Sequence, residues 1–361
     1  RLYCVINKRI KLIMAYTTIN KQTDYFNTKT YSGTGSAQSI TGVGFRPDWL
    51  WIKHREDVSN HKLQDVIRGS TKVIGSNENS AEATVAQGVT SFDSDGFSLG
   101  TDASVNGTGA AGIVAWNWLA GGSQGSSNTD GTINTTYTSV NTTAGFSICT
   151  WTGTGANGTI GHGLGAKPEM IIVKNYSAAQ NWCVYHSGLG GTEGHKALYL
   201  DLNYNEVDQT GFWNDTASTS SVFSVGTNTN TNGSSASMIA YCFAPKTGYS
   251  KFGSYTGNGN VDGTFVYTGF KPAFILTKAS TANDNWTLWD NKRGSSNVVQ
   301  SMLRADATNA ETNSSTYQVD LLSNGFKWRA SDSKINASSP YIYMAFGQSI
   351  VGTNNIPATA R

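Results

Sequence analysis

The sequence predicts an all-β protein made of three tandem homologous repeats, each a β-sandwich (jelly-roll or lectin-like) unit. Three observations support this fold class. One spaced motif occurs three times along the chain, the apolar segments are short and rich in β-branched and aromatic residues, and Asp-Gly and Asn-Gly pairs supply tight hairpin turns. No segment places apolar residues at helical spacing for more than about two turns.

Each repeat carries a proline that is followed six residues later by a lysine. The three pairs, which lie 121 and 104 residues apart, are Pro47/Lys53, Pro168/Lys174 and Pro272/Lys278. The register then continues downstream without a gap. The residues found 14, 18 and 22 positions after the prolines are His61, Trp182 and Trp286, then Asp65, His186 and Asp290, then Gly69, Gly190 and Gly294. A register this long indicates that one structural unit has been triplicated.

The repeats divide the chain into five segments. Residues 1–30 are a leader and docking segment, residues 31–125, 145–247 and 252–348 are β repeats 1, 2 and 3, and residues 349–361 are a C-terminal tail. Residues 1–13 are interpreted as a translated upstream leader, because Met14 is a natural start and Lys8-Arg9-Ile10 can be encoded by a purine-rich ribosome-binding sequence. The stretch from about Ala15 to Asn27 is expected to dock the protein or to cap repeat 1. The sequence leaves open whether the repeats form three domains or one pseudo-threefold body.

Local patterns assign the elements of each repeat in chain order. The segments that follow the three prolines are predicted strands of about five residues: WLWIK (49–53), MIIVK (170–174) and FILTK (274–278). DSDGF (93–97) and SNGF (323–326) are predicted hairpin turns. Each repeat closes on an apolar, aromatic strand, within 113–120, 238–245 and 341–348. The stretches 77–87 and 304–315 are expected to form either one short helix or a loop.

Composition limits the class of protein. Charged residues make up 14% of the chain, against roughly 25% in an ordinary soluble domain. The net charge of +2 gives no electrostatic basis for binding nucleic acid, and an aromatic content of 11% argues against intrinsic disorder. No stretch reaches the roughly 20 apolar residues of a membrane helix, and the N-terminus lacks the apolar run of a signal peptide. A polar, weakly charged surface is typical of an extracellular or virion β-protein.

The four cysteines, Cys4, Cys149, Cys183 and Cys242, do not have the spacing of metal ligands. Two of them lie in apolar, strand-like runs. We therefore expect buried free thiols in a protein that is made in a reducing cytoplasm. A disulfide between Cys149 and Cys183 is the alternative.

Two equivalent pairs, Trp182 with His186 and Trp286 with Asp290, are the candidate ligand-binding residues. Residues four apart on a strand point to the same face. An aromatic ring beside a polar group suits a sugar, because the ring covers the C–H face and the polar group orients the hydroxyls. The alternative is that these tryptophans pack the core of each sandwich.

No motif predicts catalysis, a metal site or a cofactor. Asp65/Arg68 and Asp290/Arg293 are expected to form ion pairs or hydrogen bonds at a turn within their repeats. Asp93-Ser-Asp95-Gly96 is predicted to be a turn rather than a calcium-binding loop, since the remaining ligands of such a loop are missing. The five histidines, the glycine-rich runs and the serines match no metal, phosphate-binding or nucleophile-elbow signature. The sequence therefore predicts a protein that is not an enzyme.

Several segments resemble a repeat family of tail and other virion proteins of marine bacteriophages, including cyanophages. These segments are GFRPDWLWIK, SFDSDGFSLG, GYSKFGSYTGNGNVDGTFVYTGFKPAF, LLSNGFKW, YIYMAFGQS and the opening MAYTTINKQTDYF. The similarity covers roughly residues 14–361. It implies a structural, tail-fibre-like role in a virion after synthesis in the host cytoplasm, and it implies no chemistry. His61, where the other repeats have tryptophan, departs from the repeat pattern.

These observations lead to one functional hypothesis and two alternatives. We expect a virion structural protein that contributes to attachment to a host-surface glycan, with other virion proteins as partners and with self-association, for which a trimer is one option. Attachment predicts an exposed aromatic patch near Trp182 or Trp286. A purely architectural or capsid-decorating protein predicts an apolar or edge-strand interface instead. A tail-borne glycan depolymerase predicts a cleft with paired carboxylates.

Overall fold

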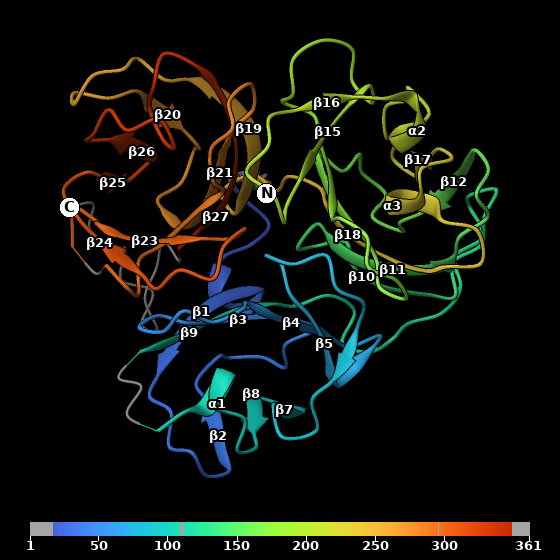
Figure 1. Ribbon diagram of the computed structural model, residues 1–361, viewed down its shortest axis with the longest axis horizontal. Coiled ribbons are helices and arrows are strands. Elements are labelled where there is room, and N and C mark those ends of the chain that lie inside the picture. The colour runs from blue at the N-terminus through green and yellow to red at the C-terminus, as the bar shows by residue number, and fades with distance from the viewer. Residues whose placement is uncertain (1–16, 109–111, 295, 349–361) are drawn as a thin grey trace, which may run out of the picture.

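The computed structural model describes residues 17–108, 112–294 and 296–348 and is all-β, with 41% of residues in strands and 5% in helices (Figure 1). The predicted all-β sandwich class is confirmed. The leader 1–13 and the tail 349–361 lie outside the described residues. The strands form three lobes around a common centre (Figure 1). We refer to residues 26–118, 137–243 and 250–347 as units 1, 2 and 3.

A six-stranded antiparallel sheet and a three-stranded sheet form unit 1. In the order of pairing, the large sheet consists of β1 (Phe26–Tyr31), β9 (Ile113–Trp118), β3 (Trp49–His54), β4 (Lys62–Asp65), β5 (Gly69–Ile74) and β6 (Ala83–Thr84). The small sheet consists of β2 (Gln38–Thr41), β8 (Gly96–Leu99) and β7 (Val89–Asp93). Strands β7 and β8 meet at Asp93 and Gly96, so the predicted hairpin turn is confirmed.

Units 2 and 3 are built in the same way. The large sheet of unit 2 is β10 (Tyr137–Asn141), β11 (Phe146–Thr152), β18 (Ser237–Phe243), β13 (Met170–Asn175), β14 (Cys183–His186), β15 (Lys196–Tyr199) and β16 (Val207–Asp208), and β12 (Gly158–Gly161) pairs with β17 (Val222–Val225). The large sheet of unit 3 is β19 (Ser250–Thr256), β27 (Pro340–Gly347), β21 (Pro272–Ala279), β22 (Thr287–Asp290), β23 (Ser301–Arg304) and β24 (Thr312–Asn313). Its small sheet is β20 (Phe265–Tyr267), β26 (Gly325–Trp328) and β25 (Val319–Leu322).

The three large sheets share one strand order, and β10 is an additional edge strand in unit 2. The homology of the three units remains a prediction, whereas their common architecture is a property of the structure. Helices are short: α1 (Ala103–Asn106), α2 (Thr210–Trp213), α3 (Thr229–Asn232) and a 3-10 turn, η1 (Gln22–Asp24). None of the described helices is long and apolar enough to cross a membrane.

The central strands are buried along their whole length, because both of their faces are covered. In β3, Trp49 and Trp51 face a core that all three units share, whereas Leu50 and Ile52 face a separate core between the large and small sheets of unit 1. Strands β13 and β21 divide their residues between the shared core and the outer cores of units 2 and 3 in the same way. Each unit is therefore a sandwich whose large sheet also packs inward.

Aromatic contacts between units fill the shared core. Trp49 of unit 1 stacks on Tyr241 of unit 2 at a centroid distance of 4.6 Å, and Phe26 of unit 1 stacks on Phe346 of unit 3 at 5.0 Å. Phe243 of unit 2 contacts Phe346 edge-on at 6.2 Å. Of the two architectures that the sequence left open, the structure is one pseudo-threefold body.

The segment before unit 1 packs on this body. Ile19 lies in the shared core, and Gln22 donates a hydrogen bond to the backbone carbonyl of Gly248 at 3.1 Å. The six residues of β1, most of which fall within the predicted leader and docking segment, form the edge of the large sheet of unit 1. The docking stretch therefore also supplies part of the first sandwich.

The remaining local predictions have clear outcomes. Cys149, Cys183 and Cys242 are buried free thiols, so the alternative disulfide is wrong, and Cys4 lies outside the described residues. The stretches 77–87 and 304–315 form loops and two-residue strands rather than a helix. Loop structure is expected there, because neither stretch offers the apolar face on which a short helix depends.

Candidate functional site

The four predicted ligand-binding side chains are buried. Trp182 is 0% exposed, Trp286 1%, His186 3% and Asp290 0%. The expected aromatic patch is therefore not formed by these residues, and this is a correction to the sequence interpretation. Both tryptophans belong to the shared core, where they cover the junctions between units.

The residues 14 positions after the repeated prolines hydrogen-bond across the junctions. In each case a ring N–H donates to a backbone carbonyl of the neighbouring unit. The bonds are Trp182 Nε1 to Gly75 at 2.8 Å, Trp286 Nε1 to Tyr199 at 2.7 Å and His61 Nε2 to Arg304 at 2.8 Å. The direction is unit 2 to 1, unit 3 to 2 and unit 1 to 3, so the bonds close a ring, as subunits do in a cyclic oligomer.

His61 makes the same hydrogen bond across a junction that tryptophan makes in the other two units. Its Nδ1 accepts a hydrogen bond from Trp51 Nε1 at 2.7 Å, which leaves Nε2 to carry the proton that it donates to Arg304. Burial lowers the pKa of His61 to about 3, so the ring is neutral at ordinary pH. The irregular repeat position thus keeps the same hydrogen bond.

A second ring of contacts involves the residues 18 positions after the prolines. Each one reaches the closing strand of a neighbouring unit. The contacts are Tyr241 Oη donating to Asp65 at 2.8 Å, Trp116 Nε1 donating to Asp290 at 3.0 Å, and His186 Nε2 donating to the backbone carbonyl of Tyr343 at 3.1 Å.

Asp65 and Asp290 accept from a side chain, whereas His186 of unit 2 donates to a backbone carbonyl, and this difference has a chemical reason. Met344 occupies the position in the closing strand of unit 3 that corresponds to Tyr241 and Trp116, and a thioether has no proton to donate. An aspartate at position 186 would therefore find no side-chain donor on the closing strand of unit 3. His186 can donate its own N–H to the backbone of that strand. Burial lowers the pKa of His186 to about 4.

A third ring is formed by backbone groups. The N–H groups of three glutamates donate to carbonyls eight positions after the repeated prolines. These bonds are Glu82 to Tyr176 at 2.8 Å, Glu206 to Ser280 at 2.7 Å and Glu311 to Arg55 at 2.6 Å. Each junction therefore contains three corresponding hydrogen bonds, which hold the units in fixed orientation.

The lysines of the repeated motif stabilise loops. Lys53 and Lys278 each donate to two backbone carbonyls close in sequence, and Lys174 donates to the carbonyls of Asn79 and Gln180. All three are fully buried, and burial lowers the pKa of each to about 8. The lysine of the repeated motif thus has a structural role in each unit.

The predicted ion pairs are confirmed. Arg68 Nε lies 2.6 Å from Asp65 Oδ2, and Arg293 Nε lies 2.6 Å from Asp290 Oδ2. Burial alone would lower the pKa of Arg293, but Asp290 and Glu311 overcome this effect and hold it above its usual range. Unit 2 has Leu189 at the arginine position, in the shared core, which fits its lack of a carboxylate partner.

The remaining motifs have structural roles. The carboxylate of Asp95 accepts the backbone N–H groups of Gly42 and Gly44 at 2.9 and 2.7 Å, so the predicted turn is tied to the preceding loop. Among the described residues, no group of three His, Cys, Asp or Glu side chains is placed to hold a metal ion.

One buried carboxylate of unit 2 holds the backbone of the junction residue Trp182. Asp201 Oδ1 accepts the backbone N–H of Trp182 at 3.1 Å, and burial raises the pKa of Asp201 to about 6. In unit 1 the same bond, to the N–H of His61, is made by Asn77 at 2.8 Å. Between pH 4 and 6 the folded chain retains a proton at Asp201 that the unfolded chain has released, so this carboxylate destabilises the fold increasingly as pH rises.

We expect Asp201→Asn to stabilise the protein at pH 7 by about 1–3 kcal/mol, because the amide keeps the hydrogen bond without a buried charge. The gain should fall to zero below about pH 4. Urea denaturation of wild type and variant at both pH values measures it, and Asp57→Asn, whose carboxylate is solvent-exposed, is the control. A variant that is less stable than wild type at pH 7 would contradict the expectation.

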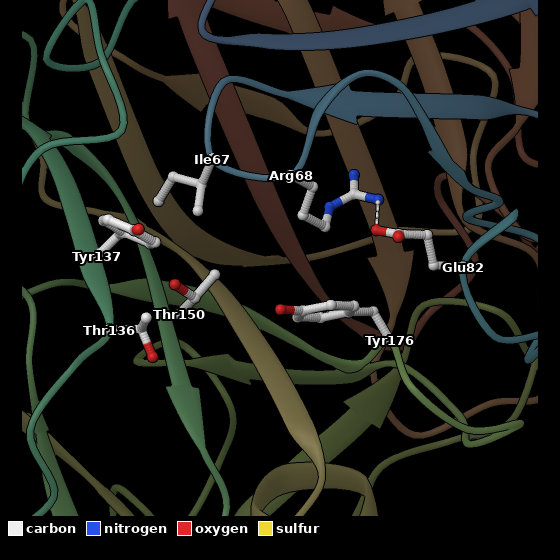
Figure 2. A pocket seen from close by; sticks show the side chains of 7 residues that line it. All are labelled: Ile67, Arg68, Glu82, Thr136, Tyr137, Thr150 and Tyr176. Atoms are coloured by element: carbon white, nitrogen blue, oxygen red, sulfur yellow. Dashed lines mark hydrogen bonds and ion pairs between the residues drawn. The ribbon is translucent and has the colours of Figure 1, made fainter. Parts of the chain in front are cut away.

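A pocket opens at the junction between units 1 and 2, with a volume of about 250 Å³. Figure 2 shows the rings of Tyr137 and Tyr176 on opposite sides of it, with Thr150 between them and the Arg68–Glu82 pair along one edge. Tyr137 belongs to β10, the strand that only the large sheet of unit 2 has. The buried hydroxyl of Thr150 has no hydrogen-bond partner in the part of the chain that the structure describes.

This pocket is a weak candidate for a ligand site. The guanidinium of Arg68 already donates to Asp65, Glu82 and backbone carbonyls. The volume of the pocket is also below the roughly 300 Å³ at which small-molecule sites begin. A water molecule hydrogen-bonded to Thr150 would satisfy its hydroxyl without any ligand.

A larger groove lies between units 2 and 3, with a volume of about 390 Å³. We call it the unit 2–3 groove. It is lined by Glu169, residues 245–248, residues 250–252 and residues 267–269. Tyr267, on its wall, is 56% exposed, so an aromatic ring is open to solvent here. Sequence reasoning missed this residue. The three corresponding strands of the small sheets have the sequences Ser-Ile-Thr, Thr-Ile-Gly and Phe-Val-Tyr, and their correspondence becomes visible once the strands are paired.

Comparison with known proteins adds a family but no activity. A family model described as a domain of unknown function (DUF7483) matches residues 21–349. No curated protein matches the chain, and no solved structure matches it.

Proposed function

Because the chain belongs to the DUF7483 family of domains of unknown function, we propose from its own residues that it is a tail-fibre-like structural component of a bacteriophage virion. It contributes to attachment of the particle to a glycan on the host surface. The protein acts by binding and by mechanical support, without catalysis.

The observation that carries this proposal is the closed ring of junctions. Three corresponding hydrogen bonds at every junction and one shared aromatic core fix the three units as a single body. The residues at the repeated positions hold this body together through their hydrogen bonds, as a structural component of a particle requires. The low content of charged residues and the resemblance to virion proteins of marine bacteriophages support the same conclusion.

A purely architectural role is the second candidate. The burial of Trp182 and Trp286 favours it, since the aromatic residues that were expected to contact a ligand are core residues. It differs from attachment in one measurable property, namely whether blocking the protein on the particle slows adsorption to the host.

Antibodies against the purified protein test both roles on particles of the phage that carries the gene. We expect immunogold labelling of intact particles, and we expect monovalent Fab fragments to lower the adsorption rate constant at least tenfold. Labelling without a change in adsorption would replace attachment by the architectural role. Unlabelled particles would overturn the proposal, and release of reducing ends from host polysaccharide by the purified protein would show an enzyme.

A further inference from the structure

Strand β20 of unit 3 presents two aromatic side chains to solvent. Phe265 is 43% exposed and Tyr267 is 56% exposed, while Val266 between them is buried in the outer core. Residues two apart on a strand point to the same face, about 7 Å apart. The outward face of β20 is therefore an aromatic surface.

The fold itself does not require aromatic residues at these positions. In unit 1 the corresponding strand β2 places Ile40 in the outer core and has Ser39 and Thr41 on either side of it, both exposed. In unit 2, Ile160 is flanked by Thr159 and Gly161. Two units thus build the same small-sheet strand with small residues. In unit 3 the edge of the Phe265 ring lies over Gly325 of the neighbouring strand β26, so packing within the sheet explains part of the burial of Phe265 but not the aromatic face that it and Tyr267 expose.

The aromatic surface continues into the unit 2–3 groove. Tyr267 lies on the groove wall, and Lys251 of β19 donates to the Tyr267 carbonyl at 2.8 Å. The ammonium group of Lys251 also lies 5.1 Å from the centroid of the Tyr267 ring. This cation–π contact holds the ring beside a positive charge.

Charged groups from both units line the same groove. Lys246 and Lys251 supply two ammonium groups, and Glu169 of unit 2 supplies one half-buried carboxyl group, whose pKa is raised by burial. An aromatic ring that can stack on a C–H face, together with hydrogen-bonding groups and an excess of positive charge, matches an acidic sugar. The volume of about 390 Å³ lies in the range of small-ligand sites.

We propose that the unit 2–3 groove and the adjoining Phe265–Tyr267 surface bind an acidic saccharide. This inference rests on the proposed attachment function for its biological role, and its test is independent of the virion experiment. Tyr267 stacks on a sugar ring in the groove, Lys246 and Lys251 contact the sugar carboxylate, and Phe265 extends the contact along the polymer.

The test is binding of the purified full-length protein to alginate, a polymer of uronic acids, with neutral dextran as the comparison. We expect binding to alginate that weakens with salt, and at least tenfold weaker binding to dextran. The double variant Phe265→Ser with Tyr267→Thr, which installs the residues of unit 1, should lose at least tenfold in affinity for alginate. Because it changes no charge, this loss cannot come from general electrostatic attraction.

Two controls make the result decisive. Tyr204→Thr removes another exposed tyrosine (52% exposed) and should bind as wild type does. The double variant should still unfold in one cooperative transition at a midpoint only slightly below that of wild type, since Phe265 and Tyr267 lie outside the cores. Unchanged binding by the double variant, equal binding to dextran, or no binding of alginate would each overturn the site, whereas unlabelled particles in the antibody experiment would overturn only the virion role.

Discussion

Trp286→Ala is expected to destabilise the whole three-unit body by about 3–5 kcal/mol, the usual cost of truncating a buried tryptophan. The side chain is buried in the shared core, and its N–H reaches the backbone carbonyl of Tyr199 at 2.7 Å across the junction of units 2 and 3. Truncation would leave both a cavity and a carbonyl without its partner. Because all three units share this core, we expect one cooperative unfolding transition at lower urea, rather than the loss of unit 3 alone.

Trp286→Phe separates the two contributions. It keeps most of the buried ring but removes the N–H donor, so we expect a cost of about 1–2 kcal/mol from the orphaned carbonyl and the smaller ring. Urea denaturation followed by circular dichroism measures both variants, and Tyr204→Ala on the surface is the control. An alanine variant as stable as wild type would contradict the assignment of Trp286 to the junction, as would a transition in which units 1 and 2 remain folded.

The local part of the fold could be predicted because its causes lie within a few residues. The strands after the three prolines and the hairpins at Asp93–Gly96 and Leu322–Gly325 depend on residue type and turn chemistry, and the structure confirms them. The repeated register likewise located the residues that matter for the junctions. The register did not show that these residues form hydrogen bonds between units rather than contact a ligand.

The role of Trp182 depends on a partner far away in the chain. Its N–H bonds to Gly75, 107 residues earlier, and no local pattern identifies that carbonyl. WLWIK is apolar on both faces, so periodicity cannot tell which face of a strand meets the shared core and which meets the small sheet. A tryptophan beside a polar residue is therefore compatible both with a junction between units and with a sugar-binding site, and the sequence does not distinguish the two.

The candidate binding surface was missed for a different reason. Strand β20 has only three residues, and alternation over three residues is too short to mark a strand. Phe265 and Tyr267 become informative only when they are compared with the small residues at the same positions of β2 and β12. That comparison needs the pairing of each strand within its small sheet, which the structure provides.

Arg293→Ala is the other change from which we expect a large effect. The guanidinium group is buried and donates to Asp290 at 2.6 Å and to Glu311 at 2.8 Å, while Asp290 also accepts from Trp116 of unit 1. Removing the cation leaves the Asp290 carboxylate buried without its counter-charge, which costs about 3–5 kcal/mol. Lys21→Ala is the surface control, because that lysine pairs with Asp24 while both side chains are about half exposed (53% and 48%), and the loss of such a pair costs at most about 1 kcal/mol.

Unit 2 shows how the same junction is built without an ion pair, and this sharpens the test. His186 and Leu189 occupy the positions of Asp290 and Arg293 there. We therefore expect the double variant Asp290→His with Arg293→Leu to be more stable than Arg293→Ala, although it carries more changes, because no charge is left buried alone. A neutral imidazole can still accept the Trp116 N–H, and Glu311 keeps Arg55 at 2.6 Å. If urea denaturation instead shows the double variant to be the less stable of the two, the cost lies in lost packing around the arginine rather than in the unpaired carboxylate.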